Sequence, residues 1–232
     1  MTEKRDGAIK ARQVADGSKQ RTYDGYDKKD RASPTVLTES VFLTGVIDAR
    51  ERRAQAIIDV ANAFLQAKND KTILMLLRGK LAEMMARIDP ALYRQYITYS
   101  AKGIPILYVR LNKALYGMLQ AALLFYKRLR RWLEDSGFKV NPYDPCVANK
   151  IIDGSQITIY WHVDDLKVSH IDKDVVTSFA VVMGKEFGSG TTIKRGKVFD
   201  YLGMELGFES CPGSMIVSMI KYLQRLLRNS RS

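Results

Sequence analysis

Apolar residues along this chain gather in short runs bounded by turn-forming residues, a pattern typical of β-strands. The predicted strands lie at residues 56–60, 73–77, 106–111, 146–152, 156–162 and 165–169, with shorter ones near 191–195, 198–208 and 214–218. Asp153-Gly154 separates two of these runs and is a strong signal for a two-residue hairpin turn. Residues 1–34 are polar and mixed in charge, which predicts an irregular arm with a short strand at 9–14.

Between the strands, apolar positions recur at helical spacing. Helices are expected from Thr38, near 80–97, at 118–134, after Asp172 and from about Ile220. Thr38 is the candidate N-cap of the first helix, which carries Phe42, Val46 and Ala49 on one face. The resulting order, β-α-β…α-β-β-α-β, predicts an α+β fold in which helices cover one face of an antiparallel, ferredoxin-like sheet.

The stretch I-Y-W-H-V-D-D-L-K-V-S-H at 159–170 places two adjacent aspartates, Asp164 and Asp165, inside a strand-like run. Neighbouring side chains of a strand point to opposite faces, so at least one of these carboxylates would face an apolar layer. Taken alone, the pair favours a tight β-turn, where aspartate is common. The residues after the pair then return as a second strand.

A third aspartate, Asp59, stands at the end of another predicted buried strand. If the two strands share a sheet, Asp59 and Asp164 meet at one edge. Grouped carboxylates repel one another and raise each other's pKa unless a cation neutralises them. Such oxygen ligands suit Mg²⁺, which takes one or two carboxylates together with substrate phosphates. Two ions about 3.5–4 Å apart serve in-line phosphoryl displacement.

Net charge favours a polyanionic partner. The 232 residues include 37 basic and 25 acidic side chains, which gives a net charge of +12. Part of the excess lies in two clusters, one of Lys127, Arg128, Arg130 and Arg131 and one of Lys221, Arg225, Arg228 and Arg231. Each cluster is equally compatible with a solvated helix face. With 46% hydrophobic residues, the chain can bury a substantial core.

Composition disfavours several other classes of protein. No apolar run is long enough for a membrane span, and the opening M-T-E-K-R-D-G is not a secretory signal. The two cysteines, Cys146 and Cys211, give neither a disulfide framework nor a zinc-binding spacing. Both are expected to be buried thiols in a reducing compartment.

Four motifs occur in order: D-V-A-N-A-F-L (59–65), L-N-K-A-L-Y-G-M-L-Q-A-A-L-L-F-Y (111–126), W-H-V-D-D-L (161–166) and Y-L-G-M-E-L (201–206). Together they resemble the reverse transcriptases of copia-type LTR retrotransposons. Fainter agreement at 10–18 and 219–227 extends the resemblance over nearly the whole chain. It implies a right-hand polymerase domain over residues 1–232, with fingers and palm and with 219–232 as the start of a truncated thumb.

The resemblance implies an RNA-directed DNA polymerase that extends a primer with dNTPs and two Mg²⁺ ions, with Mn²⁺ as an alternative. Asp59, Asp164 and Asp165 match the catalytic carboxylates of the family. The same three residues, together with the Val60 carbonyl, match its metal ligands. Within this set Asp165 matches the weaker, supporting member.

Further positions match the family's substrate contacts. The nucleotide-binding set is Lys10, Arg12, Phe64, Tyr116, Gly117 and Gln120. The primer-contacting set is His162, Val163, Tyr201, Leu202 and Gly203. Phe64 is also compatible with a core role, and Lys10 and Arg12 with a solvated arm. The sequence departs from the family at His162, where a tyrosine is usual, and after Gly117, where L-Q-A-A replaces K-Q-A-P.

The expected partners are an RNA template, a DNA primer or product and dNTPs, with integrase and RNase H as other segments of a longer polyprotein. The expected location is intracellular, in a cytoplasmic virus-like particle or the nucleus, without membrane contact. Two alternatives stay open at this point. One is a catalytically inert remnant that only binds nucleic acid, and the other is a different template-directed polymerase, such as an intron maturase.

Overall fold

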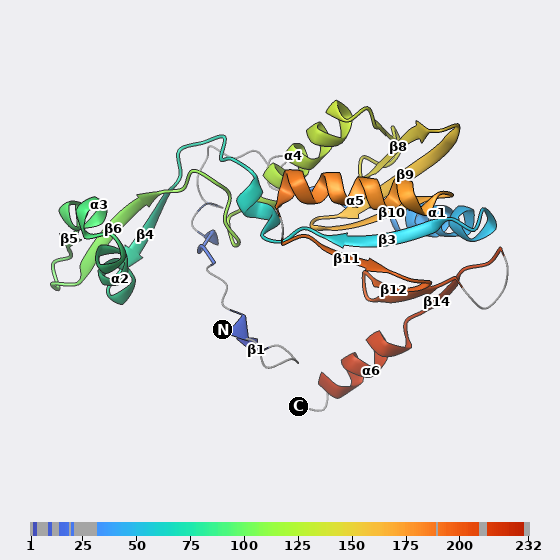
Figure 1. The fold of residues 1–232 in the computed structure, drawn as a ribbon. Helices are drawn as coiled ribbons and strands as arrows, with labels where there is room; N and C mark the ends of the chain where they lie inside the picture. The colour runs from blue at the N-terminus through green and yellow to red at the C-terminus, as the bar shows by residue number, and fades with distance from the viewer. Residues whose placement is uncertain are drawn as a thin grey trace. The chain divides into compact units, whose positions relative to one another are not determined.

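The fold is that of a computed structural model. It describes residues 2–3, 9–10, 14–18, 20, 32–188, 190–208 and 213–229. The chain forms two compact units, a larger one of residues 32–63 and 125–232 and a smaller one of residues 1–31 and 64–124. Figure 1 shows the elements of both units. Arg12, Cys211 and Arg231, which were singled out above, lie outside the described residues.

The larger unit is built on an antiparallel sheet of six strands in the order β11-β3-β10-β9-β8-β7, here called the large sheet. Its strands are β3 (Ala54–Asp59), β7 (Lys139–Val140), β8 (Val147–Ile152), β9 (Ser155–His162), β10 (Asp165–His170) and β11 (Thr192–Arg195). Asp153 and Gly154 join β8 to β9, and both have positive φ, 49° and 78°. The predicted hairpin turn is therefore confirmed.

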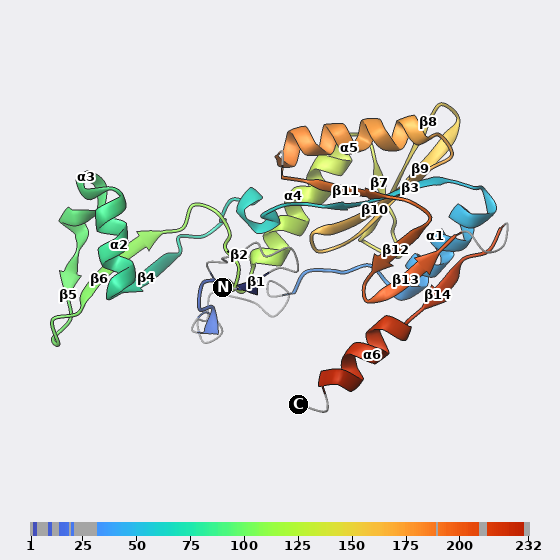
Figure 2. The same ribbon diagram turned by 60° about the horizontal axis from the view of Figure 1, so that its bottom comes forward.

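Apolar side chains fill one face of the large sheet. Leu166 on β10 and Trp161 on β9 are opposed in register and buried, so they point to the same face. The helices that cover this face are α4 (Ala121–Asp135) and α5 (Lys173–Phe187). The ring of Trp161 lies 6.2 Å from that of Tyr126 on α4. Figure 2 shows the two helices on one side of the sheet, which is the layer that the sequence predicts.

Polar and aromatic side chains occupy the opposite face. Lys167 of β10 and Tyr160 of β9 are opposed there, and both are buried. The covering elements are α1 (Thr38–Arg50) and a small sheet of β12 (Val198–Tyr201), β13 (Met204–Gly207) and β14 (Ile216–Ser218). Asp48 of α1 bonds to Lys167, and the ring of Tyr201 lies 5.3 Å from that of Tyr160. The structure thus adds a helix on the face opposite α4 and α5.

Helix α1 starts differently from the expectation. Leu37, not Thr38, is the N-cap; it has no capping side chain, and its N–H donates to the Asp144 carboxylate at 2.9 Å. This long-range bond fixes where the chain enters the helix, so Thr38 becomes the first helical residue. The buried residues of α1 are Val41, Thr44, Gly45, Asp48 and Ala49. Phe42 and Val46, expected to share a face with Ala49, are exposed.

The smaller unit contains a three-stranded antiparallel sheet in the order β4-β6-β5. The elements of this part of the chain are β1 (Thr2–Glu3), β2 (Ile9–Lys10), η3 (Ala63–Gln66), β4 (Leu74–Arg78), α2 (Lys80–Ile88), α3 (Pro90–Tyr93), η4 (Arg94–Tyr96), β5 (Thr98–Tyr99) and β6 (Pro105–Arg110). Leu77 and Leu107 pack with Ala82 of α2 in a buried cluster. The helix predicted near 80–97 is interrupted at Asp89-Pro90, because the residue before a proline disfavours the helical conformation.

The predicted C-terminal helix is confirmed as α6 (Ile220–Asn229), which follows the small sheet in the chain. Lys221 on α6 bonds to Glu205 of β13 and lies 3.9 Å from the Asp200 carboxylate. These contacts link the first turn of α6 to the small sheet. Across the described residues, no helix combines the length and the apolar composition needed to cross a membrane.

Candidate active site

The hairpin of β9 and β10 carries Asp164 and Asp165. His162 and Asp165 are opposed in its register, so Val163 and Asp164 form a two-residue turn. Val163 has a φ of +59°, and Asp164 is not among the residues with positive φ, which is the pattern of a type II′ turn. A β-branched residue seldom adopts positive φ because its side chain conflicts with the backbone. The predicted tight turn is observed, and it holds backbone strain at Val163.

Asp59 lies directly beside this turn. It is the last residue of β3 and is opposed to Asp165 of β10 on one side and to Thr192 of β11 on the other. Opposed residues share a face, so the carboxylates of Asp59 and Asp165 stand side by side. The Val60 N–H donates to the Asp164 carbonyl oxygen at 3.1 Å. The structure therefore brings the three predicted carboxylates to one edge of the large sheet.

Crowding of these carboxylates affects the pKa of Asp165. Burial by neighbouring atoms raises this pKa most, and the charges of Asp164 and Asp59 raise it further. Lys194 on β11 and the opposed His162 act in the opposite direction. Asp59 and Asp165 are nevertheless exposed, and Asp164 is half-buried. A cationic ligand can therefore reach all three, and its charge would relieve their repulsion.

The donors match a hard divalent cation in type, but they do not form a closed cage. Within the part of the chain that the structure describes, no three Asp, Glu, His or Cys side chains are gathered closely enough to hold a metal ion. Mg²⁺ is commonly bound by one or two carboxylates, with waters and substrate phosphates completing its shell. The open, mutually repelling set fits an ion that arrives together with a phosphate ligand.

Tyr201 lies beneath the turn and not at its surface. Its side chain is 2% exposed, its hydroxyl donates to the Asp165 carbonyl oxygen at 3.4 Å, and its ring packs on Tyr160. Leu202 and Gly203 form the exposed turn between β12 and β13, with φ of 52° and 79°. Primer contact thus stays a prediction for Leu202 and Gly203, whereas the Tyr201 side chain supports the backbone of Asp165.

In the smaller unit, Phe64 and Tyr116 form one aromatic cluster. Their ring centroids are 4.4 Å apart, the rings are tilted by 46°, and both are half-buried. Gly117 follows with a φ of +87°, and a Cβ on it would lie 2.0 Å from the Ala15 carbonyl oxygen. The Ala15 N–H in turn donates to the Tyr116 carbonyl oxygen at 2.7 Å. The structure therefore assembles three residues of the predicted nucleotide-binding set, and only glycine fits the third position.

The other members of that set are Gln120, Lys10 and Arg12. The Gln120 side chain is 4% exposed, and its Oε1 accepts no hydrogen bond from any residue that the structure describes. A nucleotide could reach this side chain only after a local rearrangement. Lys10 contributes its backbone to β2, while its side chain, like Arg12, lies outside the described residues. Binding roles for these three residues stay predictions.

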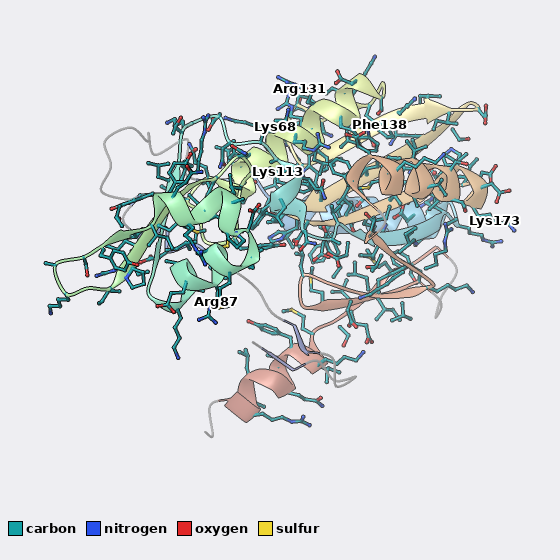
Figure 3. All side chains as sticks on the ribbon, turned by 60° about the vertical axis from the view of Figure 1, so that its left-hand side comes forward. Lys68, Arg87, Lys113, Arg131, Phe138 and Lys173 are labelled. Carbon is teal, nitrogen blue, oxygen red and sulfur yellow. The ribbon has the colours of Figure 1, made fainter. Side chains whose placement is uncertain are left out.

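Basic side chains are distributed over both units. Lys68 and Lys113, labelled in Figure 3, pair in an isolated antiparallel bridge of the smaller unit. In the cluster on α4, Arg128 and Arg130 form ion pairs with glutamates, at 3.0 and 2.9 Å. Arg131 of the same cluster is exposed. The α4 cluster is therefore partly neutralised within the protein, whereas the Lys68–Lys113 pair concentrates charge.

Comparison with known proteins settles the family. Residues 1–231 match the protein family described as reverse transcriptase (RNA-dependent DNA polymerase). This chain belongs to that family.

Individual relatives place this reverse transcriptase more closely. It is 25% identical over 219 residues to a retrovirus-related Pol polyprotein from transposon TNT 1-94 of Nicotiana tabacum. That match covers 94% of this chain and 15% of the polyprotein, so the chain spans a small part of its relative's length. The predicted membership among the reverse transcriptases of copia-type retrotransposons is confirmed.

Solved structures similar to this chain include two telomerases. One is the telomerase of Candida albicans in complex with a TWJ fragment of telomeric RNA, with 11% identity and a TM-score of 0.41 over 92% of this chain and 41% of that one. The other is the apo telomerase of Candida tropicalis, with 12% identity and a TM-score of 0.41 over 78% of this chain and 37% of that one.

The structure adds residues that the sequence motifs did not indicate. Thr192 stands opposite Asp59, and Lys194 acts on the Asp165 carboxylate from the same strand. The run T-I-K-R gave only a weak strand signal, and nothing in it identifies β3 as the neighbour. Lys167 and Tyr160 lie inside the motif-bearing stretch, but alternation alone did not reveal that both are buried.

Proposed function

We propose that this chain carries out RNA-directed DNA synthesis through Asp59, Asp164 and Asp165. The register of β3 and β10 is the observation that carries the proposal, because it opposes Asp59 to Asp165. The hydrogen bond from Val60 to the Asp164 carbonyl oxygen holds the turn against the end of β3. Exposed carboxylates grouped at strand ends suit a phosphoryl-transfer reaction in which the substrate brings its own phosphates.

In this proposal, each residue of the site has a separate role. Asp59 and Asp164, with the Val60 carbonyl oxygen, hold two Mg²⁺ ions, for which Mn²⁺ can substitute. Such ions, when bound, activate a primer 3′-hydroxyl and neutralise the charge of the triphosphate and the departing pyrophosphate. Asp165 has the weaker, supporting role that the family resemblance implies; burial, and then the charges of Asp164 and Asp59, raise its pKa. His162 is opposed to Asp165 in the hairpin, and its proposed role is to donate a hydrogen bond to the primer.

The cluster of Phe64 and Tyr116 is the proposed floor of the nucleotide site. A planar ring beneath the sugar leaves no room for a ribose 2′-hydroxyl and offers it no hydrogen-bond partner. An unpaired buried hydroxyl costs about 1–3 kcal/mol before steric conflict is counted. Support comes from the contact between the two rings, whose centroids are 4.4 Å apart, and from their partial exposure.

Sugar selection tests the role of Phe64. Phe64→Val should let ribonucleotides compete with dNTPs while dNTP incorporation falls modestly. If Phe64 only fills the core, truncation lowers stability, by about 3–5 kcal/mol for Phe64→Ala, and sugar choice does not change. Incorporation of rNTP against dNTP, measured beside thermal unfolding, separates the two roles. A folded Phe64→Val protein with unaltered sugar selectivity removes Phe64 from the nucleotide site.

The two compact units correspond, in this proposal, to the parts of a right-hand polymerase. Residues 64–124 form the fingers, residues 32–63 and 125–218 the palm, and residues 219–232 the start of a thumb. The proposed ligands are an RNA template, a DNA primer and dNTPs, and the net charge of +12 supports a polyanionic partner. Integrase and RNase H segments of a Pol polyprotein, within an intracellular particle or the nucleus, are the proposed context.

Primer extension tests the proposed function directly. The chain is incubated with poly(rA)·oligo(dT), dTTP and Mg²⁺, and parallel samples contain a chelator in place of the metal. Gel shifts on the same duplex report binding. Extension that requires the divalent ion supports the proposal. Tight, salt-sensitive binding without extension identifies the chain instead as an inert nucleic-acid binder.

A further inference from the structure

A buried ion pair lies behind the catalytic turn. Lys167 is two residues from Asp165 on β10 and therefore points to the same face of the large sheet. It is 1% exposed and bonds to the carboxylate of Asp48 on α1, which is also 1% exposed. Burial lowers the pKa of Lys167, and Asp48 acts in the opposite direction. An apolar pair of similar volume would usually be at least as stable, so stability alone does not explain the charges.

Two aromatic rings lie close to the ammonium group of Lys167. Its Nζ lies 5.3 Å from the ring centroid of Tyr160 and 5.6 Å from that of Phe208. Tyr160 packs in turn on Tyr201, whose hydroxyl donates to the Asp165 carbonyl oxygen. A continuous series of contacts therefore connects the Asp48–Lys167 ion pair to the backbone of Asp165.

Arg53 connects the same helix end to the other strand of the hairpin. Its Nη1 donates to the Thr158 Oγ1 on β9 at 3.0 Å and lies 4.0 Å from the Asp48 Oδ1. Asp48 near the end of α1 thus holds β10 through Lys167, and Arg53, in the segment between α1 and β3, holds β9 through Thr158. These four residues, Asp48, Arg53, Thr158 and Lys167, are here called the α1 clamp.

The α1 clamp restricts the register of the hairpin, that is, which residues of β10 pair with residues of β3 and β9. A slip of β10 by one residue would turn every side chain to the other face of the sheet. Lys167 would then enter the apolar layer under α4 and α5, and Asp165 would no longer stand opposite Asp59. Leu166 and Val168 also oppose such a slip, because it would move both out of the apolar layer. An unpaired ammonium in that layer is strongly disfavoured.

We propose that the α1 clamp is a positioning device that fixes the register of β10 and so sets Asp164 and Asp165 against Asp59. This inference rests on the proposed function for its catalytic consequence. Its structural part, the restraint on the hairpin, stands on the contacts alone. The members of the clamp touch no substrate; they act through the backbone of the turn.

An apolar replacement of the ion pair separates positioning from stability. Lys167→Met alone leaves Asp48 buried without a partner and should lower the melting temperature. The double variant Asp48→Leu/Lys167→Met should recover the melting temperature of the wild type or exceed it. If the clamp positions the turn, the recovered protein still extends poly(rA)·oligo(dT) about 10- to 100-fold more slowly at saturating dTTP. The KM for dTTP and the affinity for the duplex should stay within about twofold, since no binding group is altered.

Hydrogen exchange at Val60 provides a readout that does not depend on activity. The Val60 amide donates to the Asp164 carbonyl oxygen, so a loosened turn should exchange this amide faster in the double variant. Thr158→Val is a milder second variant that keeps the ion pair and should change kcat and exchange in the same direction by less. Leu133→Met, in the buried face of α4, controls for packing changes remote from the clamp.

The combined results separate the positioning role of the α1 clamp from the proposed polymerase function. A double variant that is stable, slow and faster-exchanging at Val60 supports the positioning role. A stable double variant with wild-type kcat and wild-type exchange overturns it, and so does an unchanged Thr158→Val protein if the double variant does not fold. If the wild-type chain itself extends no primer, the proposed function fails, and exchange at Val60 alone decides whether the clamp restrains the turn.

Discussion

The two faces of the large sheet are built from different chemistry. On one face, Leu166 and Trp161 pack under α4 and α5. On the other, Lys167 and Thr158 are buried under α1 with charged and hydrogen-bonding partners. Asp59 and Asp165 stand opposite each other at the end of this second face. The apolar face supplies burial, which is strong but not directional, whereas the polar face supplies bonds that are satisfied in a single register.

We expect the greatest loss of stability when a charged side chain is introduced into the apolar face of the large sheet. Val168 is fully buried there, and Val168→Lys would place an ammonium in the apolar layer under α4 and α5. We expect a loss of about 4 kcal/mol or more in the free energy of unfolding, although the same side chain is accommodated one residue away at position 167. Val168→Met, of similar length but uncharged, should cost about 1–3 kcal/mol. Urea unfolding of both variants checks the difference; equal losses would contradict a difference between the faces.

Adjacent residues of β9 allow a closer comparison. Thr158→Val removes the acceptor that buried Arg53 uses at 3.0 Å, with little change of shape, and should cost about 1–3 kcal/mol. Ile159→Val, on the apolar face, removes one methylene group and should cost about 0.5–1.5 kcal/mol. Chemical denaturation at pH 7 measures both changes. If Thr158→Val is neutral, the hydrogen bond to Arg53 does not hold β9 in place.

A smaller effect is expected at the turn itself. Val163 adopts a φ of +59°, a region that glycine enters without steric conflict. Val163→Gly should relieve backbone strain and leave the free energy of unfolding within about 1 kcal/mol of the wild type, on the stabilising side. The freer turn should at the same time lower the rate of primer extension. A stability loss beyond about 2 kcal/mol would show that packing of the valine outweighs its strain.

The smallest predicted effect concerns the charge of Asp165. Its folded-state pKa is raised, so ionisation favours the unfolded chain, and the resulting destabilisation is present above that pKa and lost as the pH falls through it. In metal-free buffer, Asp165→Asn should therefore be slightly more stable than the wild type at pH 7, by well under ~1 kcal/mol because the side chain is exposed. The difference should vanish below about pH 4.

Thermal unfolding at the two pH values, with and without Mg²⁺, checks this prediction. Added Mg²⁺ should stabilise the wild type more than the Asp165→Asn protein, because the ion relieves the same repulsion. A variant that is less stable than the wild type at pH 7 without metal would contradict the raised pKa.

Local signals in the sequence were sufficient for much of the fold. The Asp153-Gly154 turn and the cap at Asp172, which accepts a hydrogen bond from the Asp174 N–H, were both predicted from residue type alone. The interruption at Pro90 was missed, although Asp89-Pro90 is a signal that could have revealed it. These features depend on a few consecutive residues, so one sequence contains the information.

The candidate site was predicted in part, and its limits have a physical cause. Asp59, Asp164 and Asp165 were identified because all three lie at the ends of predicted strands and match the catalytic carboxylates that the family resemblance implies. The pairing of Lys167 with Asp48, 119 residues away in the chain, was not predicted. Burial of a charge depends on its partner, and a partner across the fold leaves no local pattern. For the same reason, α1 was expected to bury a different set of residues.

Substitution of single carboxylates is the sharpest test of whether Asp59 and Asp164 carry out catalysis. Asp59→Asn and Asp164→Asn keep the shape of each side chain and remove its charge, whereas Asp153→Asn makes the same change in the β8–β9 turn. Extension of poly(rA)·oligo(dT) should fall at least ~1,000-fold for the first two variants and stay at the wild-type rate for the third. Affinity for the duplex should remain within about twofold for all three, since binding depends on basic residues. Extension by Asp59→Asn or Asp164→Asn at near the wild-type rate would contradict a catalytic role for these residues.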